Sequence, residues 1–259
     1  MKLRPHHTAA IAALVLALPA QAQLPSALKT QVSSSVNSAW PALEGIYKDL
    51  HAHPELAFQE TRTAGKLAAE MRKLGFTVTE KVGKTGVVAI YKNGAGPTVM
   101  VRTELDGLPM EEKSGLPYAS RAKASSEGRE SFTAHSCGHD IHMTSWLATA
   151  RTLVNMKSQW SGTLMFVAQP AEETVSGAKA MLADGLFTRF AKPDYAFALH
   201  SWPLAHGTVG PAPFFSTATT PVLPTFSVTV KPSLRISAAS LAAVRVSWKA
   251  ISGWACRSL

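Results

Sequence analysis

Short apolar runs alternate with amphipathic segments along much of this 259-residue chain. The runs at 98–101, 163–168 and 195–199 are rich in apolar and β-branched residues, as expected of buried strands. Apolar residues recur at helical spacing in 141–155, and a further helix is predicted at 177–182. Strands that alternate with helices predict an α/β fold, with a mostly parallel sheet flanked by helices.

The N-terminal part of the chain has a similar pattern. Apolar residues recur at near-helical spacing between Ser26 and Leu50, and Pro41 is predicted to break this segment into two helices. A second helix is predicted at 61–74. The runs at 77–79 and 87–91 predict two more strands.

Reactive side chains follow the predicted core strands or open a helix. They are Glu104 and Asp106, then Glu172 and Glu173, then His200, with Cys137 and His139 just before the helix at 141–155. In parallel α/β sheets, chemistry collects at the carboxyl ends of the strands. We therefore expect these side chains to meet at one edge of the sheet.

The eight residues from His135 to His142 contain three histidines, a cysteine and an aspartate. Cys137 and His139 are separated by one glycine, which lets the backbone turn so that both side chains point inward. A thiolate and an imidazole suit zinc, cobalt, nickel or manganese to differing degrees. Asp140 and His142 are predicted to orient these ligands. The alternative is an ordinary helix start with histidines on the surface.

Glu172 and Glu173 directly follow a buried strand. Because neighbouring side chains on an extended backbone diverge, one carboxylate can bind a metal while the other faces a substrate. A metal-bound water also needs a carboxylate that takes its proton and passes it to a leaving amine. We assign Glu173 as the ligand and Glu172 as the general base, with a solvated loop as the alternative.

A competing mechanism uses Cys137 as a nucleophile, with His139 or His135 as its base. This mechanism explains the cysteine and one histidine. It leaves the two glutamates and His200 without a role, so it ranks second.

The first 22 residues are interpreted as a signal peptide. A short basic start is followed by the apolar run 9–20 and by Ala20-Gln21-Ala22, a small-x-small cleavage pattern. The run is too short for a transmembrane helix, so we expect a secreted or periplasmic protein that is not membrane-bound after cleavage. The net charge of +9 is scattered over the sequence, which argues against a nucleic-acid partner.

Six motifs occur in an order that resembles a known enzyme family. They are His51-Ala52-His53-Pro54-Glu55-Leu56, Asp106-Gly107-Leu108-Pro109, Gly115-Leu116-Pro117-Tyr118, Cys137-Gly138-His139-Asp140, Pro170-Ala171-Glu172-Glu173 and the segment 200–210. The family is the amidohydrolase branch of the dinuclear aminoacylase and carboxypeptidase-type metallopeptidases. Hippurate hydrolases, auxin-conjugate hydrolases and N-acetyl-diaminopimelate deacetylases belong to this branch.

The resemblance implies a zinc-exopeptidase-like catalytic domain and hydrolysis of an N-acyl amino acid or a small peptide. Two divalent metal ions (zinc, manganese, cobalt or nickel) serve the complete family fold. Glu172 matches the general base, and Asp106 matches a carboxylate close to the metals. The matched metal ligands are Cys137, His139, Glu173 and His200.

The resemblance also sets the expected domains. Residues 23–222 are assigned to an incomplete catalytic domain, and 223–231 to the first strand of a smaller α+β lid or dimerisation domain. The tail at 232–259 departs from the family pattern and is expected to be disordered. It lacks acidic residues and histidine, so a last metal-ligand histidine is missing.

We therefore expect a truncated chain with impaired hydrolysis, and homo-oligomers only with the missing domain. A metal-binding remnant without catalytic activity is the alternative.

Overall fold

The structure is a computed structural model that describes residues 25–126 and 128–201. The predicted signal peptide (1–22), lid strand (223–231) and divergent tail (232–259) lie outside these residues, as does the end of the predicted catalytic region. Within the described part, no helix has the length and hydropathy needed to cross a membrane.

Within the described residues, a five-stranded mixed sheet forms the centre of the fold. Its spatial order is β1 (Thr77–Val82), β2 (Gly86–Asn93), β6 (Gly162–Gln169), β3 (Thr98–Glu104) and β7 (Tyr195–Ala198). β6, β3 and β7 run parallel to one another, whereas β1 and β2 are antiparallel to their neighbours. The predicted α/β fold is confirmed. Its parallel part is limited to three strands, because a short turn joins β1 to β2 as a hairpin.

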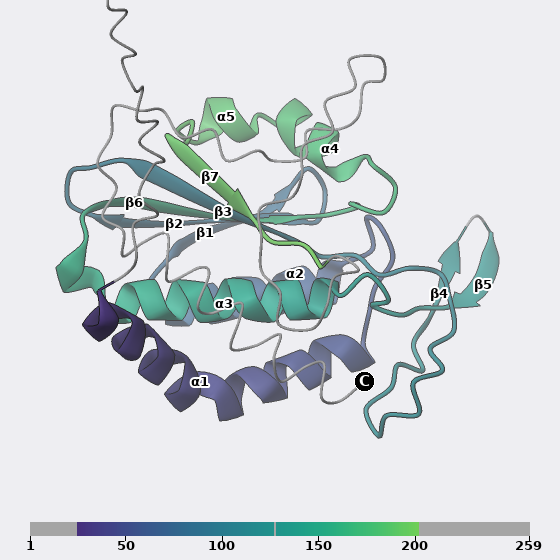
Figure 1. The fold of residues 1–259 in the computed structure, drawn as a ribbon. Helices are drawn as coiled ribbons and strands as arrows, with labels where there is room; N and C mark the ends of the chain where they lie inside the picture. The colour runs from purple at the N-terminus through teal and green to yellow at the C-terminus, as the bar shows by residue number, and fades with distance from the viewer. Residues whose placement is uncertain (1–24, 127, 202–259) are drawn as a thin grey trace, which may run out of the picture.

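Helices cover both faces of this sheet (Figure 1). On one face lie α2 (Thr61–Lys73) and α3 (His139–Asn155), and α1 (Ser26–Ala52) packs against α3. The other face carries α4 (Gly177–Ala183) and α5 (Leu186–Arg189). The remaining elements in residues 25–126 and 128–201 are a 3₁₀ turn, η1 (Lys157–Gln159), and a two-stranded sheet of β4 (Lys123–Ser126) and β5 (Arg129–Phe132), which lies apart from the main sheet (Figure 1).

The central strand β6 is buried on both faces. Leu164 and Phe166 belong to the core under α1, α2 and α3, whereas Met165 and Val167 belong to the core under α4 and α5. Successive side chains of a strand point to opposite faces, so a strand between two helix layers needs an unbroken apolar run. This explains why residues 163–168 show no alternation of polar and apolar residues.

Pro41 does not break the first helix, contrary to the prediction, because α1 continues from Ser26 to Ala52. A proline removes one backbone hydrogen bond, which leaves the carbonyl of Asn37 without its helical partner. Asn37 and Pro41 are both exposed, so water can satisfy that carbonyl. The helix bends near its middle (Figure 1), as prolines inside helices commonly cause.

Strand β3 also runs further than predicted. The predicted strand covers 98–101, with a loop expected to begin near Arg102, but β3 continues to Glu104, which pairs in register with Gln169 of β6. Arg102 forms an ion pair with Glu104, whose side chain is fully buried. Because the two opposite charges neutralise each other, both residues can remain in the partly buried strand.

Candidate metal centre

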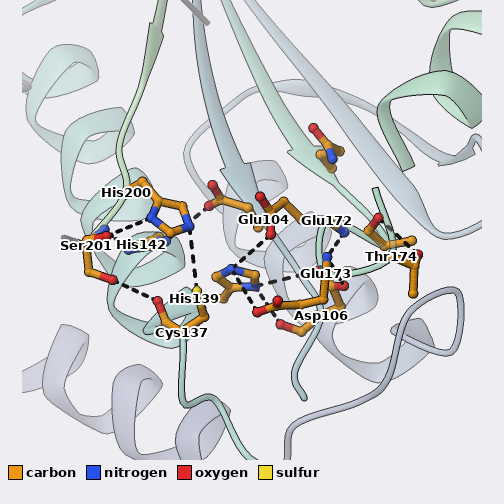
Figure 2. Close-up of polar contacts among 12 residues, drawn as sticks. Glu104, Asp106, Cys137, His139, His142, Glu172, Glu173, Thr174, His200 and Ser201 are labelled. Atoms are coloured by element: carbon orange, nitrogen blue, oxygen red, sulfur yellow. Dashed lines mark hydrogen bonds and ion pairs between the residues drawn. The ribbon is translucent and has the colours of Figure 1, made fainter. Parts of the chain in front are cut away.

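The reactive side chains predicted from the sequence do meet at the carboxyl edge of the parallel strands (Figure 2). β3 ends at Glu104, and Asp106 follows two residues later. Glu172 and Glu173 follow the end of β6, and His200 follows the end of β7. Cys137 and His139 complete this set of reactive residues, and they lie at the N-terminal end of α3.

A left-handed glycine positions the Cys137 and His139 side chains. Gly138, the residue before α3, has a φ of 78°, a conformation that other residues adopt at an energetic cost. A Cβ atom at this position would also lie 3.1 Å from the hydroxyl of Ser201. With this turn, the Cys137 Sγ lies 3.7 Å from Nε2 of His200.

The fully buried His139 ring is at the centre of the group. Its Nδ1 lies 2.6 Å from the backbone carbonyl of Asp106, and a carbonyl only accepts, so Nδ1 donates. In the neutral ring, Nε2 then carries a lone pair. This Nε2 lies 3.7 Å from Oε2 of Glu172 and 3.7 Å from Oε1 of Glu173. Figure 2 shows His139 between this glutamate pair and the Cys137–His200 pair.

The donor atoms fit a divalent metal. Three overlapping groups have donor atoms within 4.8 Å of one another: Cys137, His139 and His200; Glu104, His142 and His200; and His139, Glu172 and Glu173. In the described part of the chain, the buried Nε2 of His139 and Oε1 of Glu173 have no hydrogen-bond partner. Thiolate, imidazole and carboxylate are common ligand types for zinc, and buried polar atoms without partners are rare. The residues therefore suit a metal ion.

The electrostatics of the group also favour a cation. Burial opposes a charge on His139, but Asp106, Cys137 and Glu104 raise its pKa to about 11. A hydrogen bond with Cys137 raises the pKa of His200 to about 9. In turn, the neighbouring rings of His139 and His200 lower the pKa of the Cys137 thiol. The negative potential that retains these protons also attracts a metal ion, which must displace a proton in order to bind.

Asp106 connects the two sides of the group. Its fully buried carboxylate accepts a hydrogen bond from the backbone N–H of Glu172 at Oδ1 and from that of Glu173 at Oδ2, each at 3.0 Å. Its backbone carbonyl accepts the hydrogen bond from His139. Asp106 thus holds both the histidine and the glutamate pair in place.

His142 ties the segment after β7 to α3. Its Nδ1 lies 3.2 Å from Oε2 of Glu104, and its Nε2 accepts a hydrogen bond from the backbone N–H of Ser201 at 2.8 Å. Burial lowers the pKa of His142, which fits a neutral ring that donates on one side and accepts on the other. Because Ser201 follows His200 directly, His142 helps to place His200, in line with its predicted orienting role.

Asp140 contacts a different partner from the one predicted. The sequence predicts that it orients the metal ligands, but its Oδ2 lies 2.6 Å from Nδ1 of His51. The other ring nitrogen of His51 lies 2.9 Å from Oε1 of Glu112. Burial opposes a charge on His51, but these two carboxylates raise its pKa to about 9. No sequence pattern joins these three residues, because they are 61 and 89 positions apart.

The glutamate pair also differs from expectation in one respect. The sequence predicts that the two side chains diverge, whereas both carboxylates face the same atom of His139. The reason is local: Ala171 and Val175 have φ values of 48° and 58°, so the backbone makes a tight turn and does not continue as a strand. Both glutamates are therefore placed beside the same nitrogen of His139.

Comparisons with known proteins agree with this geometry. The chain is 40% identical over 161 residues to the hippurate hydrolase of Campylobacter jejuni, which corresponds to 62% of this chain and 39% of that protein. It is 41% identical over 171 residues to the N-acetyldiaminopimelate deacetylase of Oceanobacillus iheyensis, covering 64% of this chain and 43% of that protein. The chain thus spans about two fifths of the length of these relatives.

A solved structure shows the same likeness. The Bacillus subtilis YXEP protein, a dinuclear metal-binding peptidase of the M20 family, matches with a TM-score of 0.57 and 32% sequence identity. The match covers 73% of this chain and 48% of that one. The sequence model of peptidase family M20/M25/M40 matches residues 100–255, including most of the tail that sequence reasoning treats as divergent. Since this match covers more than half of the chain, the protein belongs to peptidase family M20/M25/M40.

Proposed function

We propose that this chain is a metal-dependent hydrolase of the amide bond in N-acyl amino acids or small peptides. The observation that carries the proposal is the buried Nε2 of His139, which makes no hydrogen bond within the described residues and which two carboxylates face at 3.7 Å. Further support comes from relatives named for hydrolysis of hippurate and for deacetylation of N-acetyldiaminopimelate.

The metal-binding role falls to four side chains: Cys137, His139, Glu173 and His200. They supply a sulfur, two imidazole nitrogens and a carboxylate, a set that suits zinc and also accommodates manganese, cobalt or nickel. Bound divalent ions would polarise the amide carbonyl and lower the pKa of the attacking water. Two such ions are proposed, because the similar YXEP protein is described as dinuclear.

The role of general base falls to Glu172. Its side chain is 30% exposed, compared with 18% for Glu173, so it is the carboxylate with better access to water and substrate. Glu172 takes a proton from the attacking water and gives it to the nitrogen of the leaving amine. Asp106 fixes the backbone of both glutamates, so we assign it a positioning role within the active site.

A cysteine-nucleophile mechanism has one observation in its favour. Cys137 lies 3.7 Å from His200, and the rings of His139 and His200 lower the pKa of its thiol. This mechanism gives no role to the glutamate pair. A chelator separates the two mechanisms, because a thiol enzyme keeps its activity when metal is removed.

The test is an assay of the purified full chain on hippurate and on N-acetyl amino acids, after reconstitution with zinc, manganese, cobalt or nickel. We expect hydrolysis that a chelator abolishes and that added metal restores. The matched control is Glu172→Gln, which keeps the size of the side chain but removes the base; we expect it to bind metal and to lose activity by at least about 100-fold.

Other outcomes of this assay would favour other functions. Activity that survives chelation would favour the cysteine mechanism. Metal binding without turnover on any of these substrates would favour a metal-binding remnant. The expected impairment of hydrolysis stays a prediction, which the turnover rate per mole of purified chain tests. Export through the predicted signal peptide likewise stays a proposal.

A further inference from the structure

The turn that carries the glutamate pair is held in a conformation that its own residues do not favour. Ala171 and Val175 both have positive φ values, although neither is a glycine. The turn also needs Gly177, because a Cβ atom there would lie 1.5 Å from the carbonyl oxygen of Pro170. A backbone of this kind persists only where surrounding groups hold it.

One of these groups is a buried carboxylate outside the predicted site. Glu60, just before α2, has an exposed fraction of 0%. Its Oε1 accepts a hydrogen bond from the backbone N–H of Ala171 at 2.8 Å. Its Oε2 accepts one from the hydroxyl of Thr85 at 2.5 Å. Buried carboxylates are uncommon unless they are paired or hydrogen-bonded, so these contacts explain its place in the core.

Glu60 and Asp106 act on consecutive residues. Glu60 accepts from the N–H of Ala171, and Asp106 accepts from those of Glu172 and Glu173. Three successive amide groups thus point at two buried carboxylates. Hydrogen bonds from backbone N–H groups to a carboxylate are stronger than those between neutral groups, so this arrangement fixes the direction of the turn.

We propose that Glu60 is a positioning residue for the metal centre, which aims the carboxylates of Glu172 and Glu173 at His139 by holding the Ala171 amide. The role in hydrolysis rests on the proposed function. The role in holding the turn does not. Among the described residues, no hydrogen bond or ion pair joins the Glu60 side chain to a predicted metal ligand, so it acts through the backbone of the turn.

Two substitutions at Glu60 separate positioning from charge. Glu60→Met keeps the length of the side chain and fills the space but accepts no hydrogen bond from Ala171. Glu60→Gln keeps an oxygen that can accept that bond, while its amide nitrogen can donate to Thr85. We expect Glu60→Met to weaken zinc affinity about 10- to 100-fold, as loss of a ligand-supporting contact commonly does. We expect Glu60→Gln to stay within about threefold of the wild type, because it retains the contact.

The matched control is Glu55→Ala. The carboxylate of Glu55 also accepts from two backbone N–H groups, those of Arg62 and Thr63, but in α2 rather than in the metal-binding turn. Its loss should lower stability and leave zinc affinity unchanged. An equal drop in affinity for Glu55→Ala and Glu60→Met would overturn the proposal, and so would an equal drop for Glu60→Gln and Glu60→Met.

Hydrogen exchange on the metal-free full chain gives a second readout. The Ala171 amide should exchange slowly in the wild type, and exchange across 171–173 should become faster in Glu60→Met but not in Glu55→Ala. Fast exchange of Ala171 in the wild type overturns the proposal even if Glu60→Met does not fold. Absence of zinc binding by the wild type would count against the proposed function, while the exchange experiment would still decide the role of Glu60 in the turn.

Discussion

Replacement of Asp106 by asparagine tests how the metal-binding turn is held. Both oxygens of Asp106 are occupied, one by the N–H of Glu172 and one by the N–H of Glu173, each at 3.0 Å. Asparagine has one acceptor oxygen and one NH₂ group, so one of the two amides would face another donor. Asp106 is fully buried, so water does not replace the lost acceptor.

The magnitude follows from these two contacts. The substitution removes one hydrogen bond to a charged group, which contributes about 1.5–3 kcal/mol. It also strands a buried N–H, which costs about 1–3 kcal/mol. The two effects overlap, because both describe the same amide, so we predict a loss of about 3 kcal/mol in the free energy of unfolding.

The assay is urea denaturation of the metal-free chain in the presence of a chelator, so that metal binding does not contribute. The midpoint should fall while the dependence on urea concentration stays constant. Asp194→Asn is the matched control: Asp194 accepts one hydrogen bond, from the N–H of Thr98, and asparagine can keep that bond. If Asp106→Asn lies within about 0.5 kcal/mol of the wild type, the explanation of the turn is wrong.

Three further predictions concern other parts of the fold. The pKa of His51 in the folded chain is about 9, above its ordinary value of 6.5. Its contribution to stability is therefore complete below about pH 6.5 and is lost as the pH rises towards 9. In urea unfolding measured across that range, His51→Gln should remove roughly 3 kcal/mol of this pH dependence. Gly177→Ala, whose Cβ would clash with the carbonyl of Pro170, should weaken zinc binding in a calorimetric titration, and unchanged affinity would contradict the described turn. Phe166→Ala, in the fully buried centre of the sheet, should lower the free energy of unfolding by about 3–5 kcal/mol, and a loss below about 1 kcal/mol would contradict the assigned core.

Much of the fold could be predicted because the information is local. The unbroken apolar run of β6 and the helical spacing in α3 depend on neighbouring residues, so the sequence shows them directly. The predictions failed where a distant partner changes the local preference. Arg102 and Glu104 are charged, which suggests a loop, but their ion pair lets them remain in strand β3. Pro41 suggests a helix break, but it is exposed, so water can bond the backbone carbonyl that loses its helical partner.

In the candidate site, too, local patterns could be predicted from the sequence, whereas contacts between distant residues could not. Cys137, His139 and His200 could be predicted to meet, because each follows a strand or opens a helix at the same edge of the sheet. Glu60 could not, because its partner Ala171 lies 111 positions away and no motif links them. His51 stands in a recognisable motif, but its contact with a carboxylate 89 positions away is visible only in the fold.

Metal binding by the purified full chain tests the central claim most directly. Isothermal titration with zinc, checked by metal analysis of the dialysed protein, should show about two ions per chain. Cys137→Ser and His139→Ala should each reduce that number or the affinity, because both remove a donor from the same group. No zinc binding by the wild-type chain, or binding that neither substitution changes, would contradict a metal centre at this edge of the sheet.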